Sequence, residues 1–124
     1  MTIRVVIAED QAMVLGALAA LLEMEDDIHV VAQVRNGRDA LQTVLASTPD
    51  VVITDIEMPR MNGLEMIRAL RAKEELRKVP VITLSALKSR EVRAQAIEAG
   101  ADHFLTKADL DEEYLLDLVR SLTA

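Results

Sequence analysis

Three short apolar runs constrain the fold of this chain more than any other feature of its sequence. Residues 3–8, 51–54 and 79–84 are rich in Val and Ile, and none of these runs alternates apolar with polar side chains. Such unbroken runs are typical of strands buried on both faces, as in a parallel sheet covered by helices. Weaker runs at 28–32 and 103–105 bring the predicted strands to five.

Segments of helical length, with an apolar period near 3.6 residues, separate these strands. Asn36, Asn62 and Ser89 are predicted to cap three helices, because a short polar side chain can accept the hydrogen bond of a free backbone N–H group. Gly100 stands where the left-handed residue after a helix belongs. Two further helices are predicted, from about Gln11 to Met24 and from about Asp109 onward. The side chains predicted to face the sheet are Ala40, Leu41, Val44, Leu45, Leu64, Ile67, Leu70, Val92, Ala96, Ile97, Leu115, Leu118 and Leu122.

The alternation of strands and helices predicts an α/β fold with a parallel sheet and right-handed crossovers. A length of 124 residues fits one domain, 1–124, and we find no linker, repeat or low-complexity tract. In such folds ligands bind beyond the carboxyl ends of the strands, where the strand order reverses. The residues that follow the predicted strands are therefore the candidates for a functional site.

Charge and composition exclude several functions. A net charge of −7 argues against nucleic-acid binding by this segment, since a phosphate backbone requires a surplus of Lys and Arg. The absence of cysteine excludes disulfides, thiol catalysis and Cys-based zinc sites, and it fits a cytoplasmic protein. The apolar run 5–8 is too short for a signal peptide or a membrane span, so no membrane association is expected.

Charged and hydroxyl side chains follow four of the predicted strands. Glu9 and Asp10 come after the first, Asp55 after the third, Ser85 after the fourth and Lys107 after the fifth. Converging carboxylates repel one another unless a lysine or a bound cation neutralises them, and oxygen ligands with room for water suit Mg²⁺. A carboxylate beside that ion, with an ammonium and a hydroxyl nearby, is well placed to attack a phosphoryl group.

Each of these residues also has an ordinary structural explanation. Asp10 alone could cap a helix, Ser85 could be a turn residue, Lys107 a solvated surface lysine, and Phe104 a core side chain. Their common position at the carboxyl ends of strands in one sheet favours a single site.

The same residues resemble the receiver domain of bacterial two-component response regulators, from Ile3 to about Leu122. The resemblance implies a single flavodoxin-like, doubly wound domain with five helices and a sheet of order 2-1-3-4-5. Its motifs occur in the family's order: Glu9-Asp10, residues 54–59 with Asn62-Gly63, Ser85-Ala86, residues 99–102, and Lys107.

The resemblance implies specific roles for these positions. Asp55 would accept a phosphoryl group from a sensor histidine kinase. Asp10, Asp55 and the backbone carbonyl of Glu57 would bind Mg²⁺, with Glu9 acting through water. Such a protein is a phosphoacceptor rather than an enzyme, although it takes phosphoryl groups from small donors and slowly loses them.

The resemblance also implies a switch. Lys107 would pair with the phosphoryl oxygens, while Ser85 and Ala86 bind the phosphoryl group and draw their loop inward. Phe104 would follow into the vacated space and change the face formed by the last two helices and the last strand.

Three positions depart from the family pattern. Ala108 follows Lys107 where the family often has a proline with a cis peptide bond, so a trans bond is expected here. Phe104 replaces the commoner Tyr, and Ser85 stands where Thr is commoner, which keeps the hydroxyl. Glu57 and Leu87 flank the expected phosphoryl entrance and should tune hydrolysis.

The first and last predicted helices indicate a dimer. Residues 12–22 contain no polar side chain, and a helix that is apolar all round is expected to be covered on both sides. The alternative is that small alanines make its outer face harmless. A homodimer through these two helices, strengthened by phosphorylation, would use Val14, Leu15, Leu18, Leu22, Leu116 and Val119.

The sequence around residues 8–11 resembles receivers of the NarL/FixJ group, which precede a LuxR-type helix-turn-helix domain. A transcription regulator is therefore the expected parent, with DNA bound only through a C-terminal output domain absent from this chain. The alternatives are a stand-alone receiver, a degenerate receiver that is not phosphorylated, a phosphohydrolase with Asp55 as nucleophile, and a flavodoxin-like electron carrier. The last two fit poorly, because Glu57 replaces the second Asp of such hydrolases and no Trp is present to stack a flavin.

Overall fold

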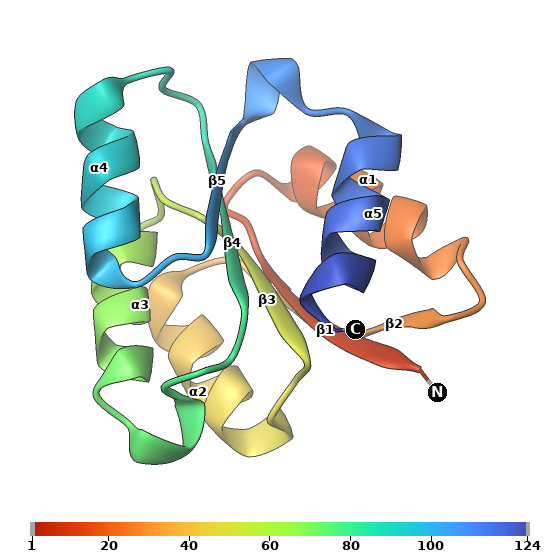
Figure 1. Ribbon diagram of the computed structural model, residues 1–124, viewed down its shortest axis with the longest axis horizontal. Helices are drawn as coiled ribbons and strands as arrows, with labels where there is room; N and C mark the ends of the chain where they lie inside the picture. The colour runs from red at the N-terminus through yellow and green to blue at the C-terminus, as the bar shows by residue number, and fades with distance from the viewer. Residues whose placement is uncertain (1, 124) are drawn as a thin grey trace.

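Five parallel strands form one sheet in the order β2-β1-β3-β4-β5 in the computed structural model, which describes residues 2–123 (Figure 1). The order and the parallel pairing confirm the predicted fold class. The strands are β1 (Ile3–Ala8), β2 (Ile28–Val34), β3 (Val51–Asp55), β4 (Val81–Ser85) and β5 (His103–Thr106).

Helices cover both faces of the sheet. Figure 1 shows α1 and α5 on one face and α2, α3 and α4 on the other. The α-helices are α1 (Ala12–Glu23), α2 (Gly37–Ser47), α3 (Gly63–Arg71), α4 (Arg90–Ala99) and α5 (Glu112–Leu122), with short 3₁₀ turns η1 (Glu74–Leu76) and η2 (Lys107–Asp109). Alternate residues of β1 enter the two cores, Val5 and Ile7 on one side and Val6 and Ala8 on the other.

The predicted helix caps are confirmed. The Asn36 side chain accepts a hydrogen bond from the third backbone N–H of α2, and Ser89 does the same for α4. Asn62 and Glu65 form a reciprocal capping box at the start of α3, with hydrogen bonds of 2.9 and 3.2 Å. Gly100 ends α4 with a φ of 118°, a conformation that favours glycine.

Two predicted boundaries are wrong. The last helix begins at Glu112 rather than near Asp109, because Asp111 caps it by accepting a 3.0 Å hydrogen bond from the Tyr114 N–H group. Strand β4 begins after Pro80, which has no N–H group to donate to the sheet.

Some inward-facing assignments are also wrong. Leu45 and Ile97 are 36% and 48% exposed, because α2 and α4 turn smaller side chains toward the sheet. Ala40 and Val44 fill that place in α2, and Ala96 fills it in α4. Leu41, Leu64, Val92 and Leu122 are only partly buried.

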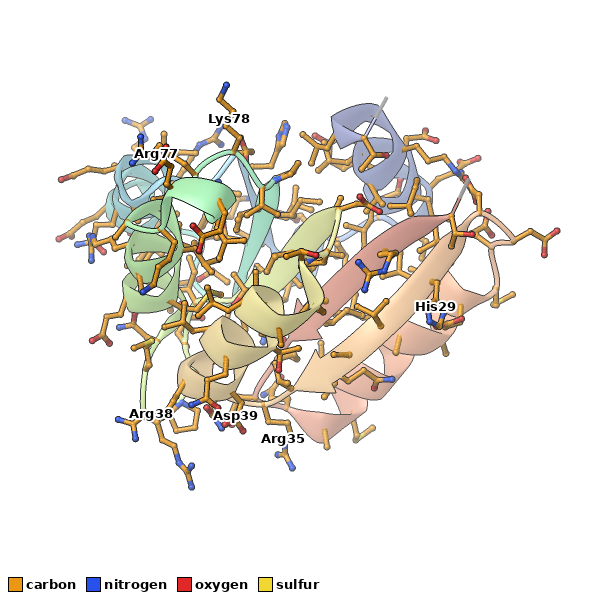
Figure 2. All side chains as sticks on the ribbon, turned by 90° about the horizontal axis from the view of Figure 1, so that it is seen from below. His29, Arg35, Arg38, Asp39, Arg77 and Lys78 are labelled. Carbon is orange, nitrogen blue, oxygen red and sulfur yellow. The ribbon has the colours of Figure 1, made fainter. Side chains whose placement is uncertain are left out.

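Arg71 connects helix α3 to loops at the amino end of the sheet through hydrogen bonds. Arg71, in α3, donates five hydrogen bonds of 2.7–3.1 Å to backbone carbonyls and one of 3.2 Å to Asp102. The carbonyls belong to Leu76, Arg77, Val79 and Gly100. Figure 2 shows Arg77 and Lys78 at this end and Arg35, Arg38 and Asp39 at the opposite, carboxyl end.

The two ends of the described chain meet at Asp27, which precedes β2. The Ile3 N–H group donates a 2.7 Å hydrogen bond to the Asp27 carbonyl. From α5, Arg120 binds both oxygens of the Asp27 carboxylate at 2.9 and 3.0 Å, and it also contacts Glu25 at 2.6 Å. This cluster joins β1, β2 and α5.

Candidate functional site

Three charged side chains meet at the carboxyl end of the sheet. Asp55 is the last residue of β3, Glu9 follows β1, and Lys107 follows β5. The Lys107 Nζ atom donates a 3.1 Å hydrogen bond to Glu9 Oε2 and lies 3.3 Å from Asp55 Oδ2. Glu9 Oε1 is closer, at 2.8 Å, in an ion-pair contact without hydrogen-bond geometry. The convergence predicted for these three residues is confirmed.

This cluster holds two carboxylates and one ammonium in a nearly dry environment, since Glu9 and Asp55 are 0% and 1% exposed. Burial, and then the charge of Glu9, raise the pKa of Asp55 to about 7, although Lys107 acts in the opposite direction. Burial lowers the pKa of Lys107, but its hydrogen bond to Glu9 and the charges of Asp55 and Glu9 outweigh this and raise it. The site therefore carries an excess of negative charge that one lysine does not neutralise.

A small cavity of about 270 Å³ opens beside this cluster. Asp10, Asp55, Glu57 and Lys107 line it together with Gln11, Ala86 and Leu87. Asp10 is half-buried, and Arg35 fixes its loop by donating hydrogen bonds of 2.7 and 3.1 Å to the Asp10 carbonyl. Figure 2 shows Arg35 at this end of the molecule, near the start of α2.

The oxygen atoms around the cavity fit Mg²⁺. Asp55 Oδ1 is buried and has no hydrogen-bond partner among the residues described, so it is an orphaned anionic oxygen. Two carboxylates, from Asp10 and Asp55, a backbone carbonyl at Glu57 and several waters make a suitable ligand set for this ion. Within residues 2–123 no three His, Cys, Asp or Glu side chains gather in a metal-binding group.

Ser85 and Ala86, two of the residues expected to act in the switch, lie at the end of β4. Ser85 ends β4 and is fully buried, and its hydroxyl donates to the Glu57 carboxylate at 3.0–3.2 Å. The Ala86 N–H group donates to Glu57 Oε1 at 3.0 Å, and the Leu87 N–H group donates to Ser85 Oγ at 3.0 Å. The sequence indicated a metal-binding role for the Glu57 carbonyl and a position beside the phosphoryl entrance, but the contacts of its side chain with Ser85 and Ala86 were missed. An acidic residue two positions after Asp55 was the only available signal.

Phe104 lies outside this cavity. It is half-buried on β5 and lines a separate groove of about 570 Å³ with Tyr114, Lys88, Arg90 and Arg93. The residues described contain no cis peptide bond, so the Lys107–Ala108 bond is trans, as expected.

The predicted exposure of the first and last helices is wrong for four residues. Leu15, Leu18, Leu22 and Val119 are at most 7% exposed, because α1 and α5 pack them against the sheet. Val14 and Leu116 are half-buried. The outer face of α1 instead presents Met13 and the small residues Gly16, Ala17 and Ala20, and Met24 follows the helix. The small residues fit the alternative that this face is harmless, but Met13 and Met24, which are 89% and 77% exposed, do not.

The family profile described as "Response regulator receiver domain" matches residues 5–120. The chain belongs to the response regulator receiver family. This receiver is 43% identical over 118 residues to the transcriptional regulatory protein YvfU of Bacillus subtilis, covering 95% of this chain and 58% of that protein. It is 42% identical over 122 residues to the transcriptional regulatory protein DesR of the same organism, covering 97% and 58%. The receiver thus spans little more than half the length of these relatives.

Solved structures of similar proteins agree with this family assignment. The receiver superimposes with a TM-score of 0.90 on a LuxR-family DNA-binding response regulator from Staphylococcus aureus, at 30% identity and with 98% and 99% of the two chains covered. The receiver domain of NarL from Mycobacterium tuberculosis gives a TM-score of 0.86 at 29% identity, with 96% and 97% covered. The family match favours a signalling switch over the hydrolase and electron-carrier alternatives. Among the described helices none has the length and apolar character needed to cross a membrane.

Proposed function

We propose that this receiver accepts a phosphoryl group on Asp55 from a sensor histidine kinase in the cytoplasm. The observation that carries the proposal is the buried Asp55 Oδ1 atom, which has no partner among the residues described and belongs to a residue lining the cavity. A carboxylate oxygen with a free lone pair, in a pocket with a lysine, is suited to attack phosphorus.

In the proposed transfer, an Asp55 oxygen forms a bond to phosphorus while the N–P bond of a phosphohistidine breaks. The histidine nitrogen keeps the electron pair of the broken bond. Lys107 lies 3.3 Å from Asp55 Oδ2, so its ammonium is placed to pair with the arriving oxygens. Mg²⁺, held by Asp10, Asp55 and the Glu57 carbonyl with Glu9 nearby, would neutralise the remaining charge.

Once the phosphoryl group is present, the Ser85 hydroxyl and the Ala86 N–H group are expected to bind it alongside Lys107. Both lie at the end of β4, and both already donate to a carboxylate in this structure. Their movement toward Asp55 would release space beside β5, where Phe104 packs against the core. This couples one charge to a two-state packing change.

The output of the proposed switch is control of transcription. The relatives YvfU and DesR are transcriptional regulators longer than this chain, so DNA would be bound by a further domain. We propose that phosphorylation favours a homodimer through α1 and α5, formed by the exposed face of α1 together with Val14 and Leu116. The buried residues Leu15, Leu18, Leu22 and Val119 would support this surface from beneath.

Phosphorylation is tested with acetyl phosphate and Mg²⁺, using intact-mass spectrometry. The wild type should gain one phosphoryl group, and Asp55→Asn should gain none. Asp26→Asn, a change at an exposed position remote from the site, is the matched control and should behave like the wild type. Undiminished modification of Asp55→Asn would contradict the assignment.

The dimer is tested by sedimentation with and without beryllofluoride, an inert mimic of the phosphoryl group. Ala20→Asp should prevent association, because it places a charge on the exposed face of α1. Ala46→Asp, on the exposed face of α2, is the matched control. A wild type that stays monomeric under both conditions would refute the interface.

A further inference from the structure

The Glu57 side chain holds an unusual position for an exposed residue. Although the residue as a whole is exposed, its carboxylate turns back toward the end of β4 and accepts hydrogen bonds from two donors. The single proton of the Ser85 hydroxyl is shared between the two carboxylate oxygens, at 3.0 and 3.2 Å, and the Ala86 N–H group donates at 3.0 Å. Hydrogen bonds to an ionised acceptor are stronger than those between neutral groups, so this is a defined binding mode for an anion.

These donors are the same groups that the proposed function assigns to the phosphoryl group. A carboxylate and a phosphoryl group both present oxygen atoms that accept hydrogen bonds from a hydroxyl and an amide. Ser85 Oγ has a single proton, so it cannot donate fully to Glu57 and to a phosphoryl oxygen at once. Glu57 and Asp55 line the same cavity, so the two anions compete for the same donors at short range.

We propose that Glu57 is a resident anion that occupies the phosphoryl-binding donors of the resting receiver and must leave them when Asp55 is modified. Glu57 is thereby a specificity-determining residue: it sets how strongly an incoming anion must bind in order to engage Ser85 and Ala86. This inference rests on the proposed phosphoryl acceptance at Asp55.

The resident anion also holds the β4–α4 loop in its resting position. The Ser85 hydroxyl donates to Glu57 and accepts from the Leu87 N–H group, so the three residues form one chain of hydrogen bonds. Departure of Glu57 frees the Ser85 proton to point toward Asp55. The phosphoryl group therefore replaces the Glu57 carboxylate at these donors, and the same exchange releases the β4–α4 loop.

The first test measures beryllofluoride binding in the presence of Mg²⁺ by NMR titration of the backbone amides. Glu57→Ala removes the competing carboxylate, and its affinity should rise by about tenfold, the effect of one charge-assisted hydrogen-bond pair. Glu57→Asp keeps the negative charge but is one methylene too short to reach the donors. If occupancy of the donors matters, Glu57→Asp should also bind more tightly than the wild type.

Repulsion through space is the competing explanation, and Glu57→Asp separates the two. An affinity of Glu57→Asp equal to that of the wild type, with only Glu57→Ala improved, would overturn the proposal. Glu98→Gln, which removes an exposed charge from α4, is the control for net charge and should leave the affinity unchanged.

A second test needs no phosphoryl mimic. Ala86 is exposed, and within the described residues its N–H group has the Glu57 carboxylate as its acceptor. Amide hydrogen exchange at Ala86 should therefore be slowed in the free wild type and become faster in Glu57→Ala and Glu57→Asp. Equal exchange in all three proteins would refute the resident contact.

The two tests keep the inference distinct from the proposed function. If no variant binds beryllofluoride while Ala86 exchange still depends on Glu57, the proposed phosphoryl acceptance at Asp55 is wrong. The contact of Glu57 with Ala86 then stands, but it does not compete with a phosphoryl group. If all variants bind beryllofluoride equally, phosphoryl acceptance stands and the resident anion is wrong.

Discussion

The two ends of the sheet differ in how fully their charged side chains are paired. At the amino end, Arg71 is matched by four backbone carbonyls and Asp102, and Arg120 is matched by Asp27 and Glu25. At the carboxyl end, Glu9 and Asp55 share one lysine, and one buried Asp55 oxygen has no partner among the described residues. The arrangement at the amino end stabilises the fold. The arrangement at the carboxyl end retains an excess of negative charge that a bound cation can neutralise.

This contrast shows which end of the domain is built for function. Buried polar groups are normally satisfied, so an unsatisfied carboxylate marks a place where stability is reduced for another reason. Substitutions at the amino end should therefore destabilise the fold, and substitutions at the carboxyl end should include some that stabilise it.

The largest effect is expected for Arg71→Ala. It removes the hydrogen bonds to three partly buried carbonyls, those of Leu76, Val79 and Gly100, and to the exposed carbonyl of Arg77, and should lower the free energy of unfolding by about 2–4 kcal/mol. The exposed Arg68 lies in the same helix, and Arg68→Ala should change that free energy by less than about 0.5 kcal/mol. Urea denaturation compares the two variants. Equal costs would remove the basis for calling the amino end the stabilising one.

Asp55→Asn should raise the free energy of unfolding, whereas Arg71→Ala lowers it. Because the pKa of Asp55 is raised to about 7, the folded state holds a proton that the unfolded state loses, and folding becomes less favourable as pH rises between about 4 and 7. Without Mg²⁺, the variant should gain about 1–3 kcal/mol in the free energy of unfolding at pH 8 and clearly less at pH 5. A gain that is independent of pH would show that the excess charge is not the cause.

Mg²⁺ should relieve the same charge in the wild type. At a concentration about tenfold above its Kd, the ion should raise the free energy of unfolding by about 1.4 kcal/mol, and a chelator should reverse this. Asp10→Asn should lose most of the increase, while Asp102→Asn, at the amino end, should retain it. Thermal unfolding followed by circular dichroism gives both values. Stabilisation by Mg²⁺ that persists in Asp10→Asn would place the ion elsewhere.

The smallest effect is expected for Arg120→Gln. Its ion pairs are partly exposed, so Tm should fall slightly, and about 0.5 M salt should reduce the difference. The hydrogen bond from Arg120 lowers the pKa of Asp27, so this contribution is present above the usual Asp pKa and lost as pH falls below it. A difference in Tm that is unaffected by salt and acid would indicate packing rather than charge.

Much of the fold followed from local patterns, because they depend on neighbours in the chain. The caps at Asn36, Asn62 and Ser89 needed only short-range spacing, and the parallel sheet followed from the alternation of strands and helices, whereas the order of the strands was implied by the resemblance to receiver domains. The convergence of Glu9, Asp55 and Lys107 followed from their position after strands. These are features that a sequence records directly.

Other features depended on tertiary packing. The apolar sequence of α1 has no polar stripe, so its period could not show that Leu15 and Leu18 face inward while Ala17 and Ala20 face solvent. The direction of the Glu57 side chain depends on two loops meeting, and no spacing within one segment predicts it.

The meeting of the chain ends at Asp27 has a consequence for topology. Figure 1 shows both ends of the described chain at the amino end of the sheet, away from the site, and Ile3 and Arg120 share Asp27 as a partner there. A short flexible linker could join the ends, and new ends could be opened in another surface loop without interrupting a strand. Such a circular permutant would keep the same neighbouring strands in the sheet. The strands would then be synthesised in a different order but would still pair in the same order.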